Sequence, residues 1–286
     1  MTEGTSVAGP STAAQISYLL PSSRVNRRYW APGAEMNTGV YAPYDVVIHN
    51  ARLSGPFTLD GHGFALERHP TQDHDWEAQY GADSSYAAEI CAIAAQMTGA
   101  DFIVPMGGMT RSSGLTGPMV QPPAAEAHVD FTQRSAHMLA DRIYRGRRPD
   151  GKGYDRFICF SIWRALSPPP QDMPLALCEG GSVRDDEGTA NTKVDVDELP
   201  QGDAIFADVP GEEDMMAATI FHHSPDHRWW YFPDMTRDEV IFIKFYDSDH
   251  SRAWRAPHTA FHDAGRADAH ERRSIEFRGV AYFTRD

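Results

Sequence analysis

The chain has 286 residues, of which 41% are hydrophobic, and its 26 Lys and Arg against 40 Asp and Glu give a formal net charge of −14. So acidic a chain argues against a nucleic-acid partner, because phosphate contacts need clustered Lys and Arg. No apolar run approaches the roughly 20 residues that cross a bilayer, and no signal-peptide pattern opens the chain, so we expect a cytoplasmic protein without a membrane partner.

Residues 1–15 are rich in Ser, Thr, Gly and Ala, a composition that predicts a flexible tail. We expect residues 16–286 to form one domain. Its first elements are a strand at 46–50 and a hairpin that joins residues 57–60 to 63–66 through a Gly-rich turn.

The central part of the chain combines helical and extended patterns. Apolar residues at a spacing of three and four predict a helix over 84–97, and a strand follows at 100–106. Residues 107–126 are rich in Gly and Pro and predict a long loop, of the kind that often covers a site. A short second helix is expected at 135–146.

The rest of the chain is dominated by β-type runs separated by turn residues. These runs lie at 157–163, 174–178, 216–222, 228–232, 240–246 and 274–283. Residues 184–203 are acidic and polar and indicate an exposed insertion. Many short strands with few helices predict a mainly β sandwich or jelly roll. The three cysteines form neither a disulfide framework nor a metal motif, so we expect reduced thiols.

His128 and Asp130 follow the Gly- and Pro-rich loop. Two positions apart on a strand, their side chains point the same way. A second histidine from a distant strand would complete a two-histidine, one-carboxylate set, which is typical of non-haem Fe(II) oxygenases. The downstream candidates are His222, His223, His227, His250, His258, His262 and His270. His258 is favoured because a short strand follows it and Arg272 lies not far beyond.

Arg272 and Ser274 open the last predicted strand. A guanidinium suits bidentate recognition of a carboxylate and a hydroxyl adds a donor, so this pair would hold a dicarboxylate co-substrate. Arg278 is the alternative clamp on the same strand. Trp230 and Phe232, in the aromatic run 228–232, either pack in the core or line a substrate pocket. Arg111, in the predicted loop, is a further candidate for substrate binding.

Several motifs resemble one family, the hydroxylase/desaturase family that includes the fungal gibberellin desaturase and the partner protein of cephamycin 7α-methoxylation. They are NAR at 50–52, LDGHGF at 59–64, HVD at 128–130, WR at 163–164, PLAL at 174–177, HRWWYFPDM at 227–235, DEV at 238–240, YDS at 246–248, PHTAF at 257–261 and RRSIEFR at 272–278. The resemblance extends over about residues 45–284. It implies a double-stranded β-helix, which is a cupin-like jelly roll with a few flanking helices.

The same resemblance implies a function and a site. The protein would hydroxylate or desaturate a small secondary metabolite with Fe(II), 2-oxoglutarate and O₂. His128, Asp130 and His258 would be the catalytic iron ligands, and Arg272 with Ser274, or Arg278, would bind 2-oxoglutarate. A nucleotide-dependent methyltransferase is disfavoured because no Gly-rich strand-to-helix fingerprint is present.

Two alternatives remain open at this stage. One is a non-catalytic accessory protein that keeps the jelly-roll fold, as the cephamycin member suggests. The other is a metal-dependent oxygenase or isomerase that needs no 2-oxoglutarate, in which the Arg272 clamp is blocked or turned away. The discriminating observation is whether the three metal ligands and Arg272 meet at one cavity.

Overall fold

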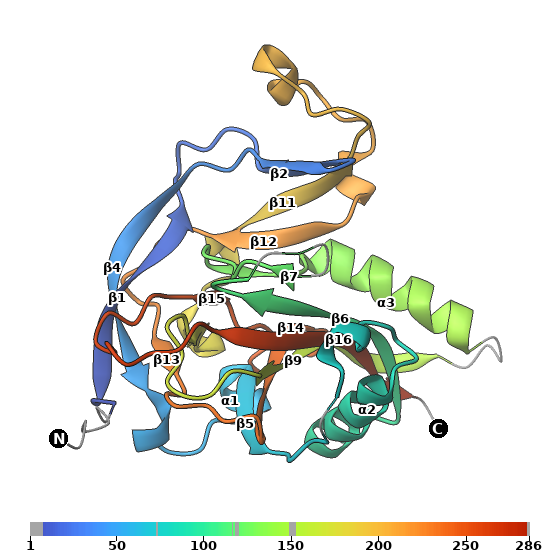
Figure 1. Cartoon of the computed structure of the whole chain (residues 1–286). Helices are drawn as coiled ribbons and strands as arrows, with labels where there is room; N and C mark the ends of the chain where they lie inside the picture. Colours follow the sequence, from blue (N-terminus) through green and yellow to red (C-terminus); the bar gives the residue numbers. More distant parts are fainter. Residues whose placement is uncertain (1–7, 73, 116, 118–119, 149–152, 285–286) are drawn as a thin grey trace.

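The computed structural model describes residues 8–72, 74–115, 117, 120–148 and 153–284, and it contains two β-sheets (Figure 1). The large sheet has ten strands in an order that departs from chain order. In spatial order these are β1 (Ser11–Leu19), β4 (Tyr41–Asn50), β13 (Trp229–Tyr231), β10 (Leu175–Cys178), β15 (His258–Ala260), β8 (His128–Val129), β12 (Ala217–Phe221), β11 (Gly188–Asp195), β2 (Arg27–Ala31) and β3 (Ala34–Asn37).

The small sheet has six strands. In spatial order these are β5 (Phe64–Arg68), β14 (Glu239–Asp247), β9 (Tyr154–Ala165), β16 (Arg273–Thr284), β6 (Phe102–Ser112) and β7 (Val120–Gln121). Most pairings in both sheets are antiparallel and join strands that are distant in the chain. Strands that alternate between two packed sheets in this way form a jelly roll, which confirms the predicted mainly β fold class.

Strand β16 shows how the sequence separates the two faces of the small sheet. Ile275 and Phe277 point to one face and belong to an apolar cluster with Tyr86 and Ile90 of helix α2 (Ser85–Thr98). Ser274, Glu276 and Arg278, the alternate residues, therefore point to the other face. This polar stripe is directed at the space between the sheets.

Two longer helices flank the sheets. The side chain of Ser84 accepts a hydrogen bond from the backbone of Ala87 and caps α2. Helix α3 (Gln133–Arg147) begins at a capping box of Thr132 with Ser135. Among the helices of the described residues, none combines the length and apolar character of a bilayer span.

The remaining helical segments are short. They are α1 (Leu59–His62) and six 3₁₀ turns at Ala51–Leu53, Trp76–Ala78, Gly180–Ser182, Asp185–Glu187, Gly202–Phe206 and Glu212–Asp214. The hairpin predicted over 57–66 is therefore wrong in its first arm. Thr58 caps a helical turn there, and only the second arm becomes a strand, β5.

Three further expectations differ from the structure. Residues 11–15 of the predicted tail lie in β1, which pairs with β4 along its whole length, whereas residues 1–7 lie outside the described part. The predicted loop 107–126 begins later, because β6 continues to Ser112 by pairing with β16. The predicted insertion 184–203 contains β11, whose buried Asn191, Thr192 and Val194 reflect pairing with β12 and β2.

Candidate metal centre

His128, Asp130 and His258 gather at the centre of the large sheet. His128 on β8 pairs directly with His258 on β15, and Asp130 directly follows β8. Nε2 of His128 lies 3.6 Å from Oδ1 of Asp130, and the two imidazole centroids are 4.5 Å apart. One donor atom from each residue lies within 4.8 Å of the others. Since metal–N and metal–O bonds measure about 2.0–2.2 Å, modest side-chain rotations bring all three donors to one divalent cation.

Backbone carbonyl groups orient both imidazoles. Nδ1 of His128 lies 2.8 Å from the carbonyl oxygen of Glu126, and Nδ1 of His258 lies 3.3 Å from that of Ala256. A carbonyl only accepts hydrogen bonds, so each Nδ1 carries a proton and Nε2 is the nitrogen left for a metal. A histidine that binds a metal through Nε2 needs this arrangement.

The electrostatics of His258 favour the same state. Burial, followed by the neighbouring His128, lowers the pKa of His258 to about 3. The imidazole of His258 is therefore neutral over the whole physiological range, and a neutral imidazole is the form that binds a metal.

Arg278 on β16 contacts the carboxylate of Asp130, and Glu276 on the same strand contacts Arg278. Nε of Arg278 lies 2.7 Å from Oδ2 of Asp130, and an Nη atom of Arg278 lies 2.7 Å from Glu276. Glu276 also receives both Nε and Nη2 of Arg111, at 3.3 and 3.2 Å. Burial alone would raise the pKa of Glu276, but the two guanidiniums outweigh burial and hold this pKa below its usual value. Glu276 is therefore an anion in the folded protein.

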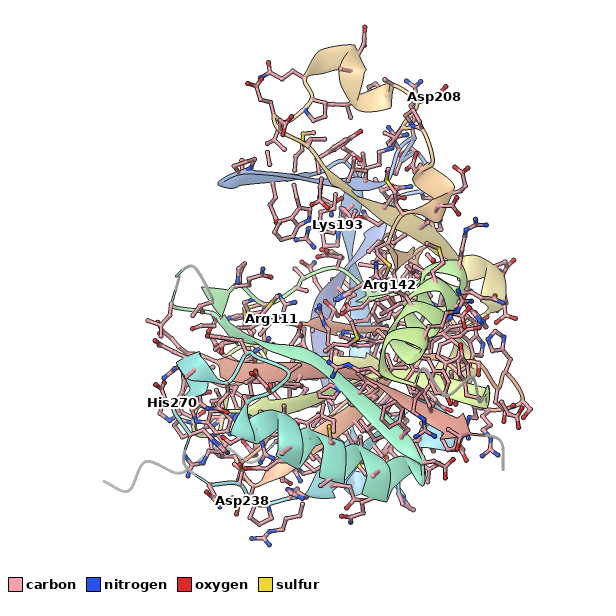
Figure 2. All side chains as sticks on the ribbon, turned by 90° about the vertical axis from the view of Figure 1, so that its right-hand side faces the viewer. Arg111, Arg142, Lys193, Asp208, Asp238 and His270 are labelled. Atoms are coloured by element: carbon pink, nitrogen blue, oxygen red, sulfur yellow. The ribbon has the colours of Figure 1, made fainter. Side chains whose placement is uncertain are left out.

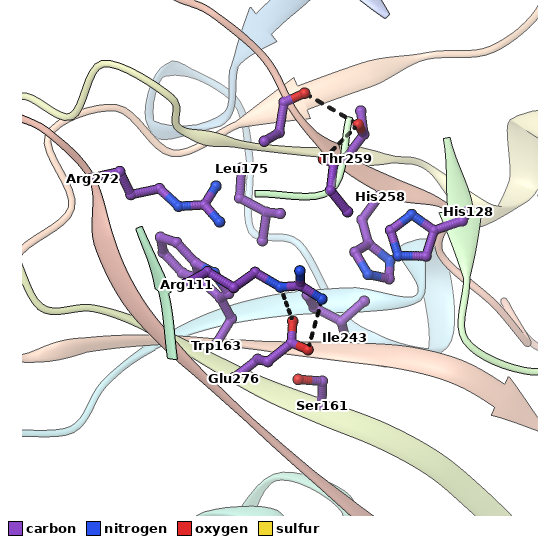
Figure 3. A pocket seen from close by; sticks show the side chains of 12 residues that line it. Arg111, His128, Ser161, Trp163, Leu175, Ile243, His258, Thr259, Arg272 and Glu276 are labelled. Atoms are coloured by element: carbon purple, nitrogen blue, oxygen red, sulfur yellow. Dashed lines mark hydrogen bonds and ion pairs between the residues drawn. The ribbon is translucent and has the colours of Figure 1, made fainter. Parts of the chain in front are cut away.

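A small cavity connects the two histidines with Arg272 (Figure 3). Arg272 stands at one end, His128 and His258 stand at the other, and the Arg111–Glu276 pair lies beside the space between them. The other side chains on the wall are mostly apolar or hydroxyl-bearing. They belong to Ala124, Ser161, Trp163, Leu175, Ile243, Thr259 and Ala260.

Arg272 is a buried cation with few protein partners. An Nη atom donates to the carbonyl of Met173 at 2.8 Å, and the guanidinium lies 5.5 Å from the ring centre of Trp163. Within the described residues its Nε has no hydrogen-bond partner, and neither has the buried hydroxyl of Ser274. Burial and the nearby charge of Arg111 lower the pKa of Arg272 to about 9. Unsatisfied buried donors of this kind fit an anionic ligand, because a carboxylate accepts several hydrogen bonds at once.

A second, larger cavity of about 640 Å³ opens on the other side of the metal group. Its floor includes His128, Asp130 and Arg278, and its walls include Arg111 of β6 and Lys193 of β11. Figure 2 shows Lys193 above Arg111 on the two sides of this region. The volume falls in the range of about 300–1,000 Å³ that holds small organic ligands.

The upper wall of this larger cavity was not predicted from the sequence. Trp30 of β2 lines the cavity, and the cationic groups of Arg28 and Lys193 lie 5.9 and 5.6 Å from its ring centre. The available signal was the alternation in the segment Arg27–Ala31, which places Arg28 and Trp30 on one face of a strand. Nothing local related that strand to the metal group, because β2 reaches it only through pairing with β11.

Two predicted substrate-binding residues lie elsewhere. The ring of Trp230 packs 4.9 Å from Phe57 and 5.1 Å from His49, and its indole NH donates to Glu179. Phe232 is buried in the main core cluster. As far as the described residues define the two cavities, neither ring lines them. The reason is the position of β13, which pairs with β4 and β10. Arg111, in contrast, lines both cavities.

The fold and the site define a class of protein. A jelly roll with two histidines and one carboxylate, open on one side to a cavity and adjoining a buried arginine, has the ligand set of a non-haem iron oxygenase. Comparison with known proteins narrows this class to a family. A family model described as an oxidoreductase/YMDC permease-like domain matches residues 16–282.

Characterised relatives agree with that match. The hydroxylase/desaturase CTB9 of Cercospora beticola is 30% identical, covering 77% of this chain and 71% of the relative. The Fe(II)/2-oxoglutarate-dependent dioxygenase nvfI of Aspergillus novofumigatus is 27% identical, covering 88% and 87%. The solved structure of the iron and alpha-ketoglutarate-dependent endoperoxidase NvfI superposes with a TM-score of 0.79 at 24% identity, over 96% of this chain and 99% of that one, which shows a common fold.

The chain belongs to the hydroxylase/desaturase family of oxidoreductases. The predicted family and the predicted class, an Fe(II)/2-oxoglutarate oxygenase, are confirmed.

Proposed function

We propose that this protein hydroxylates or desaturates a small secondary metabolite, with iron held by His128, Asp130 and His258 and with 2-oxoglutarate held by Arg272 and Ser274. One observation carries the proposal. The two histidines and Arg272 line the same small cavity from opposite ends, so a dicarboxylate that spans this cavity would contact both.

The roles of the residues follow from their protonation and burial. Nε2 of His128, Nε2 of His258 and an oxygen of Asp130 would hold the cation, and a set of three protein ligands would leave room on it for a co-substrate. Arg272 receives the distal carboxylate of the co-substrate in a buried environment, where a charge-assisted hydrogen bond is stronger than in water. When bound, Fe(II) with 2-oxoglutarate and O₂ supplies the oxidising power for attack on a C–H bond.

The larger cavity is the proposed substrate site. Its floor contains His128 and Asp130, so a molecule within it lies against the metal group. Phe131, Met109 and Met216 add apolar surface to a wall that also carries charged side chains, and Arg111 lines both cavities. Positioning of one C–H bond over the cation is therefore the main task of this wall.

The two alternative functions lose their support. An accessory protein has no need of a buried arginine aimed at a metal group, and an oxygenase that does not use 2-oxoglutarate has no need of a cavity between them. His128, His258 and Arg272 nevertheless line one cavity. The cytoplasmic location, the absence of a nucleic-acid or membrane partner, and the single domain at 16–286 stay predictions.

Anaerobic binding of Fe(II) tests the iron site. We expect one equivalent of iron per chain in the wild type and none retained by His128→Ala after gel filtration. His262→Ala, which removes an exposed histidine only four residues beyond His258, serves as the matched control and binds iron normally. Stoichiometric iron in His128→Ala would remove that residue from the proposed site.

Turnover of 2-oxoglutarate tests the reaction class. The iron-loaded protein is expected to release succinate from 2-oxoglutarate in air, faster when a substrate occupies the larger cavity. An iron-loaded protein that oxidises a substrate without forming succinate would contradict the proposed use of 2-oxoglutarate.

A further inference from the structure

Arg278 and Glu276 lie beside the metal group but are not metal ligands. We propose that Arg278 is a positioning residue for the carboxylate of Asp130, and that Glu276 in turn fixes Arg278. This inference rests on the proposed iron site, and it adds a charged residue that orients one of the three ligands, Asp130.

The two oxygens of Asp130 have different neighbours. Oδ2 lies 2.7 Å from Nε of Arg278, whereas Oδ1 lies 3.6 Å from Nε2 of His128. The contact with Arg278 is an ion pair without the alignment of a hydrogen bond, so its strength is Coulombic. The guanidinium of Arg278 thereby holds Oδ2, and Oδ1 remains available to a cation that the two histidines would also bind. A single-oxygen ligand keeps more positions open on the metal than a chelating carboxylate does.

Arg278 is itself held in place. Glu276, two residues earlier on β16, points to the same face and accepts a hydrogen bond from Nη2 of Arg278 at 2.7 Å. Glu276 is buried and also binds two nitrogens of Arg111. The guanidinium of Arg278 is therefore fixed by one carboxylate while it acts on another, as is common for groups that orient metal ligands.

The same chain of contacts reaches the wall of the larger cavity. Arg111 donates through Nη1 to the carbonyl of Pro122 at 2.9 Å, and Pro122 lines that cavity. The path from Pro122 through Arg111, Glu276 and Arg278 to Asp130 is continuous and mostly ionic. The orientation of the Asp130 carboxylate is thus coupled to the position of residues 120–126 beside the larger cavity.

These contacts also separate the roles of the two arginines. Arg278 forms ion pairs with Asp130 and Glu276. Arg272 lies at the far end of the small cavity from the histidines, and within the described residues its guanidinium forms no ion pair and donates to the carbonyl of Met173. Arg272 is consequently the arginine that remains available to a co-substrate, and Arg278 acts on the metal ligand instead.

The test is a titration of metal-free protein with Co(II), which reports both the dissociation constant and, through its visible spectrum, the ligand geometry. We expect Arg278→Met to weaken Co(II) binding by about 10- to 100-fold, the usual cost of removing an outer support of a metal ligand, and to change the spectrum. Arg278→Lys should restore part of the affinity, and Glu276→Gln should lie between the wild type and Arg278→Met.

Arg273→Met is the matched control, because Arg273 lies on the same strand but points to the opposite face. It is expected to bind Co(II) as the wild type does. If Arg278→Met and Glu276→Gln bind Co(II) with wild-type affinity and spectrum, the inference is overturned while the iron site stands. If the wild type binds no Co(II), the proposed function fails and the inference fails with it. Circular dichroism checks folding, and Glu276→Gln decides the matter if Arg278→Met does not fold.

Discussion

Replacement of Arg272 by methionine separates a binding role from a structural one. The substitution keeps a long apolar stem and removes the guanidinium at the far end of the small cavity. A carboxylate bound by Arg272 gains charge-assisted hydrogen bonds of about 1.5–3 kcal/mol each. Loss of about 3 kcal/mol in total corresponds to a roughly 100-fold weaker affinity for 2-oxoglutarate.

The stability of the protein without ligands should respond differently. The side chain of Arg272 makes one hydrogen bond within the described residues, to the carbonyl of Met173, and burial disfavours its charge. The lost bond costs about 1 kcal/mol, and removal of a buried charge without a counterion returns a similar amount. We therefore expect the free energy of unfolding to change by less than about 1 kcal/mol.

Two measurements on the same variant decide the question. Calorimetric titration of 2-oxoglutarate into Co(II)-loaded protein gives the affinity, and urea unfolding of the metal-free protein gives the stability. Arg273→Met is again the control, with both quantities unchanged. Affinity of Arg272→Met within threefold of wild type, or an equal loss of affinity and stability, would refute the assignment of Arg272 to the co-substrate.

Three predictions concern the scaffold. Burial lowers the pKa of His227 from its ordinary 6.5, and Glu187 opposes this only in part. As the pH falls, His227 of the unfolded chain takes up a proton before His227 of the folded chain does, so the free energy of unfolding decreases below about pH 6.5. Urea unfolding between pH 7 and 5 should show a smaller decrease in His227→Gln than in the wild type. An equal decrease in the two proteins would contradict this. Gly63 and Gly33 both have a left-handed backbone, which costs a residue with a side chain about 1–2 kcal/mol of stability. Gly63→Ala should cost more than this in the same denaturation assay, because its Cβ would lie 2.8 Å from the carbonyl oxygen of Arg255. Gly33→Ala should cost only the backbone penalty, because nothing lies within 4 Å of its Cβ. Lys244→Met should destabilise by about 1.5–3 kcal/mol in the same assay, because the buried Asp247, 2.7 Å from Nζ, keeps only Arg156 as a cationic partner; an unchanged free energy of unfolding would contradict this.

Most of the metal group could be predicted from the sequence. His128 and Asp130 share a local pattern, since side chains two apart on a strand point the same way. His258 could be favoured over six other histidines only by its position before the last strand and by resemblance to a family. The structure supplies the missing step, which is the direct pairing of His258 with His128 between β15 and β8.

Other features depended on contacts that no local pattern contains. The sequence offers Arg278 as the alternative to Arg272 for binding the co-substrate, and in the structure Arg278 on β16 lies against Asp130. Trp230 was expected to line a pocket or to pack in the core, and its packing on Phe57 depends on the position of β13 next to β4. The acidic composition of residues 184–203 predicts an exposed insertion, whereas β11 in this segment is partly buried because it pairs with β12 and β2.

The narrowest place in the large sheet coincides with the metal group. Strand β8 has two residues and β15 has three, and they join through the single pair His128 and His258. Because so few backbone hydrogen bonds join β8 to β15, we expect the ten-stranded sheet to open most easily between these two strands. A cation bound by both imidazoles would hold the two strands together. Amide exchange and protease cutting around β8 and β15 should then report occupancy directly, even for a preparation whose natural substrate is unknown.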